Sequence, residues 1–220
     1  MDIPLLGKNA RVSDKKIAGM HFLNVVRVVW LREILIYFRD RPRVISAFMM
    51  PIVMLILFGE GLGGIIELPG ISYRQFIFPG MVAMIVLMNS IFAGVTIVTD
   101  RQFGFLREML VAPVSRTAIA VAKIFGGATI ALINGVVLFA FAPLMGIDIS
   151  FLIVVKLMGL ILLVGFMLTG IGVSIGSRLR TPESFQMLSQ AIIFPAMFLS
   201  GVFFPVNNTA KWLDFFVQFN

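Results

Sequence analysis

The sequence predicts an all-α integral membrane protein, folded as a polytopic helical bundle. Of its 220 residues, 59% are hydrophobic and only 13% are charged, whereas an ordinary soluble domain has about 25% charged residues. The apolar residues are also gathered into runs, because five long intervals hold no charged side chain: 44–59, 75–99, 124–147, 157–177 and 184–210. A membrane helix needs roughly 20 apolar residues, so four of these intervals are long enough to cross a bilayer.

The first interval has only 16 residues, but the side chain of Glu60 can reach the interface while Ile65 and Ile66 extend the apolar run. Pro51 and Pro195 should interrupt the first and the last span. We therefore predict a transmembrane domain over 44–204 with five spans, at about 44–62, 76–98, 124–145, 157–176 and 184–204.

The orientation follows from the basic residues, which favour the cytoplasmic side of a membrane. With the N-terminus in the cytoplasm, 15 of the 18 Lys and Arg residues lie inside and 3 outside. We expect a multi-pass protein of the plasma (inner) membrane, whose basic face contacts anionic lipid headgroups. The net charge of +7 then needs no nucleic-acid partner, since no basic patch is interleaved with exposed aromatic residues.

The N-terminal segment 1–43 opens with polar residues and lacks the apolar core of a signal peptide. From 21 to 40 an apolar stripe recurs at helical spacing, and the charged residues, Arg32 and Glu33 among them, are predicted to lie off it. We expect an amphipathic helix over 21–40 that lies along the cytoplasmic surface and ends before Pro42.

Small and polar residues within the spans predict helix contacts. Gly126 and Gly127 let helices approach closely. A ladder of small residues marks a packing face on the fourth span: Gly165, Gly170, Gly172, Ser174 and Gly176. Asn89 and Asn134 are uncharged polar residues within spans, where such a side chain bonds a neighbouring helix or, alternatively, lines a transport path.

The interval 99–118 is the polar connection between the second and third spans, yet it carries a helical pattern. Its apolar residues recur at helical spacing, namely Phe103, Leu106, Met109 and Leu110. Pro113 should end this helix, and Ser115 stands where it can cap the next one. The segment is either an amphipathic connector in the headgroup region or a short helix presented to a cytoplasmic partner.

The sequence holds few of the groups from which active sites are built. It has no Cys and a single His, His21, which we interpret as a solvated residue, so metal ligation and thiol catalysis are excluded by count. No GxxxxGK[ST] phosphate loop occurs, so the chain itself is not a nucleotide-hydrolysing enzyme. No charged residue lies in mid-span, which disfavours self-powered ion-coupled transport. What remains is a membrane scaffold that another component drives.

Residues 100–123 resemble the cytoplasmic loop of the permease subunits of ABC-2 type ATP-binding cassette transporters. The likeness is carried by Asp100-Arg101, Gly104-Phe105-Leu106-Arg107-Glu108, Leu110 through Pro113 to Ser115-Arg116, and Lys123. A second patch, from Phe198 to Pro205 and on to Asn220, is similar to the stretch before that family's last span. Asp100, Phe105 and Arg107 stand where many members have Glu, Thr and Glu. These departures fit the drug and lipooligosaccharide exporter branch, which includes the daunorubicin-resistance and nodulation-factor export permeases.

The resemblance implies a permease subunit that pairs with a second permease copy, as a homodimer or a heterodimer, and docks cytoplasmic ATP-binding cassette subunits on the 100–116 segment. ATP would bind to those subunits, and this chain would bind no cofactor. The helix before Pro113 would be the coupling helix, and the helix over 21–40 the connecting helix. The implied coupling residues are Asp100, Arg101, Gly104, Phe105, Leu106, Arg107, Glu108, Met109, Leu110, Pro113, Ser115, Arg116 and Lys123. An amphipathic small molecule, drug or lipid-linked glycan would move outward, with Asn89 and Asn134 as candidate path residues.

Five spans leave the C-terminus outside, so we expect residues 205–220 to form an external segment that leads to a sixth span beyond Asn220. Two other functions stay open: a secondary transporter or channel subunit, and a membrane scaffold that docks a regulatory partner. Nucleotide-dependent behaviour would separate the exporter from both.

Overall fold

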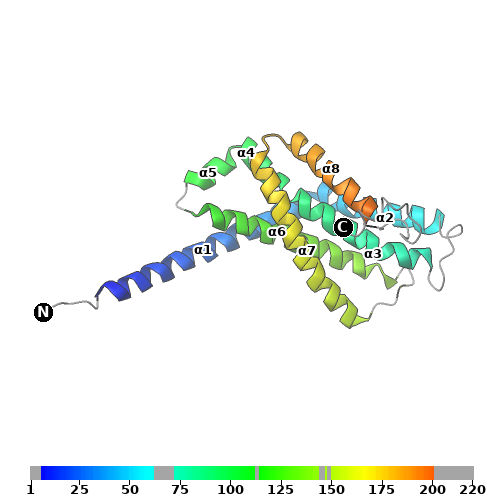
Figure 1. Ribbon diagram of the computed structural model, residues 1–220, viewed down its shortest axis with the longest axis horizontal. Coiled ribbons are helices and arrows are strands. Elements are labelled where there is room, and N and C mark those ends of the chain that lie inside the picture. Colours follow the sequence, from blue (N-terminus) through cyan, green and yellow to red (C-terminus); the bar gives the residue numbers. More distant parts are fainter. Residues whose placement is uncertain (1–5, 62–71, 112–113, 144–146, 148–149, 201–220) are drawn as a thin grey trace.

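The computed structural model describes residues 6–61, 72–111, 114–143, 147 and 150–200, and the regular elements in these residues are all helical. The chain runs through the helices α1 (Leu6–Arg39), α2 (Arg41–Gly61), α3 (Tyr73–Phe92), α4 (Val95–Gln102), α5 (Phe105–Val111), α6 (Arg116–Ala140), α7 (Phe151–Arg178) and α8 (Pro182–Leu199) (Figure 1). The predicted all-α class is thus confirmed for the part of the chain that the structure describes.

Four helical stretches are long and apolar enough to cross a membrane: Arg41–Gly59, Gln75–Gln102, Arg116–Ala140 and Phe151–Arg178. They coincide with the first four predicted spans. The fifth predicted span, 184–204, begins in α8, whose first half is polar because it carries Glu183, Gln186 and Gln190. Its last residues and the predicted external segment 205–220 lie outside the described residues, so the count of five spans stays a prediction.

The first helix is longer than the predicted surface helix, since α1 starts at Leu6 rather than near residue 21. No proline lies between its two ends, so nothing in the sequence forces a break. The first part of α1 projects away from the bundle, whereas its last part packs beside α6 (Figure 1). α1 ends at Arg39 and α2 begins at Arg41, close to the end predicted before Pro42.

The second predicted span is divided into α3 and α4 by a turn at Ala93 and Gly94. A Cβ atom on Gly94 would overlap the carbonyl oxygen of Gly172 in α7, and a Cβ atom on Gly172 would overlap the carbonyl oxygen of Ile91. The two backbones therefore touch directly, which is possible only where side chains are absent.

The small-residue ladder of α7 forms a packing face in part. Gly165, Gly172 and Gly176 are buried against neighbouring helices, but Gly170 is half-buried and Ser174 is exposed. Residues two apart on a helix point to different sides, so the five small residues cannot share one face. The close approach predicted at Gly126 and Gly127 is confirmed, because added Cβ atoms there would crowd Glu33 of α1 and Thr169 of α7.

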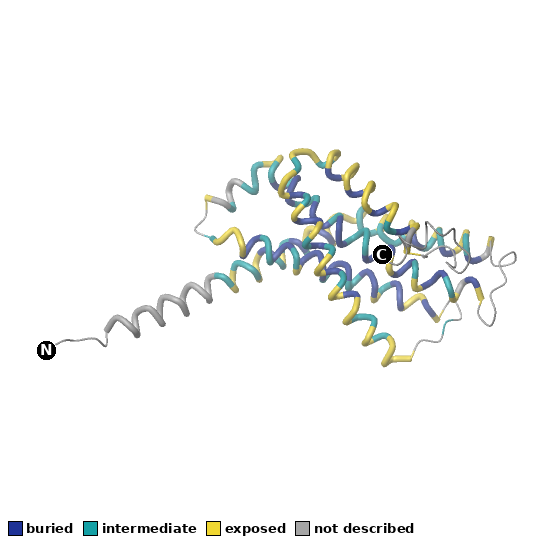
Figure 2. Tube along the Cα trace, viewed as in Figure 1, coloured by how far each residue is buried: buried dark blue, intermediate teal, exposed yellow. Residues whose placement is uncertain are grey.

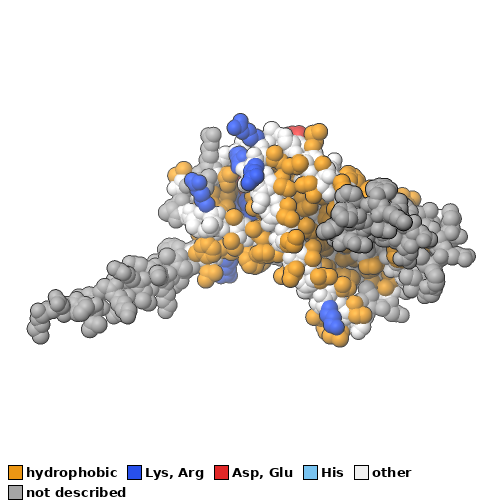
Figure 3. All heavy atoms as spheres, viewed as in Figure 1, with side chains coloured by type: hydrophobic (Ala, Val, Ile, Leu, Met, Phe, Trp, Pro, Cys, Tyr) orange, Lys and Arg blue, Asp and Glu red, His pale blue; other side chains and the backbone are white. Residues whose placement is uncertain are grey.

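The core lies where α3, α6 and α7 cross, and Figure 2 shows buried residues gathered there. Fully or nearly buried side chains in this region include Ile77, Met81 and Ile85 of α3, Ala131 and Leu138 of α6, and Ile161 of α7. The outer faces of α7 and α8 are hydrophobic, whereas Lys and Arg side chains gather toward the end of the bundle that holds α5, the start of α6 and the end of α7 (Figure 3). We call this end of the bundle the α5 end.

Candidate functional site

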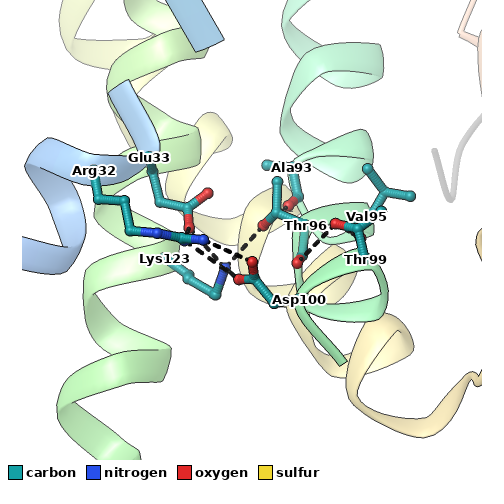
Figure 4. Close-up of polar contacts among 8 residues, drawn as sticks. All are labelled: Arg32, Glu33, Ala93, Val95, Thr96, Thr99, Asp100 and Lys123. Carbon is teal, nitrogen blue, oxygen red and sulfur yellow. Dashed lines mark hydrogen bonds and ion pairs between the residues drawn. The ribbon is translucent and has the colours of Figure 1, made fainter. Parts of the chain in front are cut away.

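Lys123 of α6 stands at the centre of a charged cluster at the α5 end (Figure 4). Its ammonium nitrogen donates to Oε1 of Glu33 in α1 at 2.7 Å, to Oδ2 of Asp100 in α4 at 2.7 Å and to Oγ1 of Thr96 at 3.1 Å. An ammonium group has three donors, so each one has a partner. Lys123 is only 3% exposed. A single buried cation thus joins α6 to α1 and α4.

Arg32 of α1 completes the cluster from its more exposed side. Its guanidinium donates to Oδ1 of Asp100 at 2.8 Å, to Oδ2 of Asp100 at 3.4 Å and to Oε1 of Glu33 at 3.1 Å. The same group lies 4.0 Å from the centroid of the Phe105 ring, at the start of α5. A cation over an aromatic face is attracted by the ring quadrupole. Arg32 therefore links α1 to both α4 and α5.

The two cations and two carboxylates of this cluster balance one another in charge. Glu33 and Asp100 are buried along with Lys123, and burial of a charge is tolerated only where it is paired and hydrogen-bonded. Removing one partner from a buried pair leaves an uncompensated charge, at a cost of about 3–5 kcal/mol. The cluster therefore strongly favours one relative position of α1, α4 and α6.

Arg101, the next residue along α4, makes a second connection at the α5 end. Its guanidinium donates to the carbonyl oxygens of Ser177 at 2.6 Å and Leu179 at 2.9 Å. These carbonyls lie at the end of α7, where the last turn of a helix leaves acceptors without an intrahelical partner. Arg101 therefore fastens α4 to the turn between α7 and α8.

A third feature of the α5 end is the short helix α5 itself. It follows Gly104, whose φ of 78° favours glycine. Phe105 and Met109 line an apolar groove of about 350 Å³ between α5, α1 and the start of α6. In contrast, Phe103, the residue that ends α4, and Val111, the last residue of α5, are 85% and 86% exposed. Apolar surface just before α5 and at its end is thus uncovered.

The residues of the predicted coupling segment lie in different surroundings in the structure. Asp100 and Lys123 are buried in the cluster, Arg101 binds the α7 carbonyls, and Phe105 lies against Arg32. Leu106 and Met109 are partly buried, Gly104 makes the turn, and Ser115 and Arg116 are exposed. Ser115 caps α6 as predicted, since its Oγ accepts from the backbone nitrogen of Ala118 at 3.2 Å. Pro113 and the side chains of Arg107, Glu108 and Leu110 lie outside the described residues.

The two candidate path residues occupy different surroundings. Asn134 is fully buried, and its Oδ1 accepts from the hydroxyl of Tyr37 in α1 at 2.9 Å. Asn89 is half-buried and donates through Nδ2 to the carbonyl of Ile85 in its own helix at 2.8 Å. Asn89 also borders a cavity of about 620 Å³. Asn134 therefore joins two helices, whereas Asn89 has open space beside it.

The prediction that Glu33 lies off the apolar stripe of α1 is wrong, because Glu33 is only 5% exposed. A signal for its burial was present in the spacing: Val29, Glu33 and Tyr37 follow one another at intervals of four and so share one helix face. Val29 and Tyr37 are buried as well. Arg32 and Thr96, which complete the cluster, carry no such signal, since their partners come from distant parts of the chain.

The fold and the site together define a multi-pass helical membrane protein with an ionic cluster at one end of its bundle. Within the described ranges, no group of three or more His, Asp or Glu side chains could hold a metal ion. Residues 24–220 match the family of ABC-2 type transporters. The chain belongs to this family.

Similar proteins carry related names. The chain is 24% identical over 184 residues to the daunorubicin resistance ABC transporter permease protein DrrB1 of Streptomyces coeruleorubidus, an alignment that covers 81% of the chain and 64% of the relative. It is 27% identical over 226 residues to a protein named transport permease ycf38 of Cyanophora paradoxa, over 94% of the chain and 75% of that protein. It is 26% identical over 148 residues to a protein named as a multidrug ABC transporter permease, YbhR of Escherichia coli (strain K12), over 66% of the chain and 40% of the relative.

The chain thus spans less than two thirds of the length of the daunorubicin-resistance relative. No solved structure matches it.

Proposed function

We propose that this chain is the transmembrane permease subunit of an ABC exporter, driven by separate ATP-binding cassette subunits that dock on the 100–116 segment. The observation that carries the proposal is the buried cluster around Lys123, which holds Asp100, at the start of this segment, and Lys123, in the helix that follows it, against α1. A partner that moves α5 would then move a segment that the cluster holds in place, rather than a loop without fixed contacts. Family membership and the names of the drug-resistance relatives support the same function.

The residues of the segment divide into two roles. The exposed apolar side chains of Phe103 and Val111 are available to anchor the ATPase, because apolar anchors at the centre of an interface carry much of its affinity. Asp100 and Lys123 are buried and act as positioning residues, which transmit the movement of α5 to α6. Arg101 transmits it to the end of α7 through the carbonyls of Ser177 and Leu179.

In this proposal the protein lies in the plasma (inner) membrane, and both the α5 end and the N-terminus are on its cytoplasmic side. The bias of Lys and Arg toward this side supports that orientation. ATP is bound and hydrolysed on the partner subunits, and this chain contributes no catalytic group and binds no cofactor. A second permease copy, identical or related, completes the path, along which an amphipathic small molecule, drug or lipid-linked glycan moves outward.

Two single-cysteine variants test this proposal, since the chain has no native Cys. Val111→Cys places a thiol at the end of α5, and Phe151→Cys is the matched control at the opposite end of the bundle; the two native residues are 86% and 82% exposed. A membrane-impermeant maleimide should label Val111→Cys from the inside only and Phe151→Cys from the outside only. A cross-linker on Val111→Cys should capture an ATPase subunit with a yield that changes when ATP is added.

Labelling of Val111→Cys from the outside would overturn the orientation and the docking role together. Labelling from the inside without an ATP-sensitive partner would leave the fold intact and exclude the exporter. That second outcome would favour a secondary transporter, a channel subunit or a scaffold for a regulatory partner.

A further inference from the structure

An apolar groove of about 350 Å³ lies between α3 and α7, in the half of the bundle opposite the α5 end. Every residue that lines it within the described ranges is apolar. Its floor is buried and includes Val82 and Val86 of α3 and Ile161 of α7, whereas Ala83 and Leu160 at its edges are exposed. Both helices belong to stretches that are long and apolar enough to cross a membrane. The groove therefore opens sideways, toward the bilayer.

The length of the groove matches the depth of one lipid leaflet. Its lining on α7 extends from Leu157 to Leu168, which is about 16 Å along a helix axis at a rise of about 1.5 Å per residue. Half of a hydrocarbon core of about 30 Å is about 15 Å. A polar ligand would lose its hydrogen bonds to water in such a lining and find no replacement. The groove thus fits a hydrocarbon chain that belongs to one leaflet.

A basic side chain lies at the end of this groove nearer the start of α7. Lys156 is exposed, directly precedes Leu157 and comes one helical turn before Leu160, so it shares a side of α7 with the edge of the groove. Side chains on a helix lean toward its start, and a lysine can lay its stem along apolar surface while its ammonium reaches the interface. Figure 3 shows basic atoms at the start of α7, apart from those at the α5 end. The ammonium therefore reaches the level of the lipid headgroups.

The charge at this end of the groove is positive. Neither α3 nor α7 contains Asp or Glu, so the two helices that form the groove give Lys156 no acidic partner. Basic residues near the membrane surface attract anionic lipids. The apolar lining thus favours an acyl chain, and Lys156 favours a headgroup with a net negative charge.

We propose that the groove between α3 and α7 binds one acyl chain of an anionic phospholipid, whose headgroup phosphate pairs with Lys156. A zwitterionic phospholipid brings the same chains, but its own cation balances its phosphate, so it binds more weakly. The site lies in the leaflet opposite the α5 end and uses none of the coupling residues. The inference therefore does not depend on docking of an ATPase.

Two photoactivatable lipids with identical chains test the inference. One is a phosphatidylglycerol and the other a phosphatidylcholine, and each carries a diazirine midway along one acyl chain. The full protein is placed in phosphatidylcholine nanodiscs that contain one of the two photolipids at the same low mole fraction. After irradiation, mass spectrometry locates the attached lipid. Ile192 and Phe194, exposed residues of α8 outside the groove, provide the internal control.

Phosphatidylglycerol should label the groove about fivefold more than phosphatidylcholine, the factor expected for one lysine near a lipid headgroup. The two lipids should label Ile192 and Phe194 equally. Ala83→Phe fills the groove without a change of charge, so it should lower labelling of the groove by both lipids and leave labelling of α8 unchanged.

The charge of Lys156 is tested by three variants. Lys156→Gln should reduce labelling of the groove by phosphatidylglycerol to that by phosphatidylcholine, whereas Lys156→Arg should keep the preference. Arg178→Gln, at an exposed arginine at the other end of α7, is the matched control and should keep it as well. In nanodiscs without anionic lipid, Lys156→Gln should unfold at the same temperature as the native protein, which separates loss of lipid binding from loss of the fold.

Equal labelling of the groove by the two photolipids would overturn the inference, because it would indicate ordinary bilayer lipid without selection of the headgroup. Labelling of α8 without labelling of the groove would also overturn it, since a second copy of this chain or another protein would then cover the groove. Loss of the preference in Arg178→Gln would assign it to the overall positive charge of the protein rather than to Lys156.

Discussion

The ammonium nitrogen of Lys123 lies 2.7 Å from a carboxylate oxygen of Asp100, in the buried interior of the α5 end. These two residues stand at the two ends of the segment that carries α5. Their ion pair therefore joins the two ends of this segment, and the ion pair between Lys123 and Glu33 connects them to α1. The geometry explains how a short helix on a surface loop can hold a defined position relative to helices that cross the membrane.

Replacing the central cation should destabilise the bundle. Lys123→Met leaves Glu33 and Asp100 with Arg32 alone, so we expect the free energy of unfolding to fall by about 3–5 kcal/mol. Thermal unfolding in nanodiscs measures the loss, and Lys156→Met, at an exposed lysine, is the matched control. The double variant Glu33→Gln/Lys123→Met removes a charge of each sign and should recover part of the loss. If Lys123→Met and Lys156→Met unfold alike, the cluster does not stabilise the fold.

The aromatic ring of Phe105 should be required for its contact with Arg32. Phe105→Leu keeps an apolar side chain but removes the ring face, so we expect a loss of about 1 kcal/mol, and Phe105→Tyr should retain the wild-type stability. The two variants are compared by thermal unfolding. Equal stability of the Leu and Tyr variants would show that the ring face contributes nothing to the position of α5.

The contact between the α3–α4 turn and α7 predicts a sharp contrast between two glycines. Gly172→Ala places a Cβ atom on the carbonyl of Ile91, so the helices must separate, and we expect a loss of about 1–3 kcal/mol or more. Gly170→Ala meets no atom closer than 4.0 Å and should be neutral or slightly stabilising, because Ala favours helix. Folded yield and thermal unfolding measure both. A mild effect of Gly172→Ala would contradict the backbone contact.

The hydrogen bonds of Arg101 should protect the turn between α7 and α8. Arg101→Gln cannot reach both carbonyls, so we expect faster hydrogen exchange of the backbone amides around 177–185 and a loss of about 1 kcal/mol, given that this site is partly open to solvent. Arg178→Gln, at a neighbouring exposed arginine, is the control and should leave exchange unchanged. Identical exchange in the two variants would show that Arg101 does not hold this turn.

Local features were predictable from the sequence where a single segment determines them. The helical stretches that can cross a membrane coincide with charge-free intervals, because length and apolarity are properties of one segment. The cap at Ser115 and the close approach at Gly126 and Gly127 follow from residue type and position alone.

Features that depend on distant partners were not predictable. The break at Gly94 comes from the approach of Gly172, which lies far along the chain. The sequence around Gly94 therefore predicts one continuous span where the structure has α3 and α4. The cluster joins Arg32 and Glu33 to residues from two other helices, and no local period marks such a pairing. Only Glu33 carried a local sign of burial, since it repeats at intervals of four with Val29 and Tyr37.

In the proposed exporter, the cluster makes α1, α5 and α6 move as one unit when the ATPase acts. Spin labels at Leu31 of α1 and Val111 of α5, both exposed residues, report the distance within this unit in the assembled transporter. A second pair, Val111 with Ile192 of α8, reports the distance from the unit to another helix.

On addition of ATP, the first distance should stay constant and the second should change, and Lys123→Met should broaden the first. A change in the Leu31–Val111 distance in the native transporter, equal to that in the Lys123→Met variant, would contradict the claim.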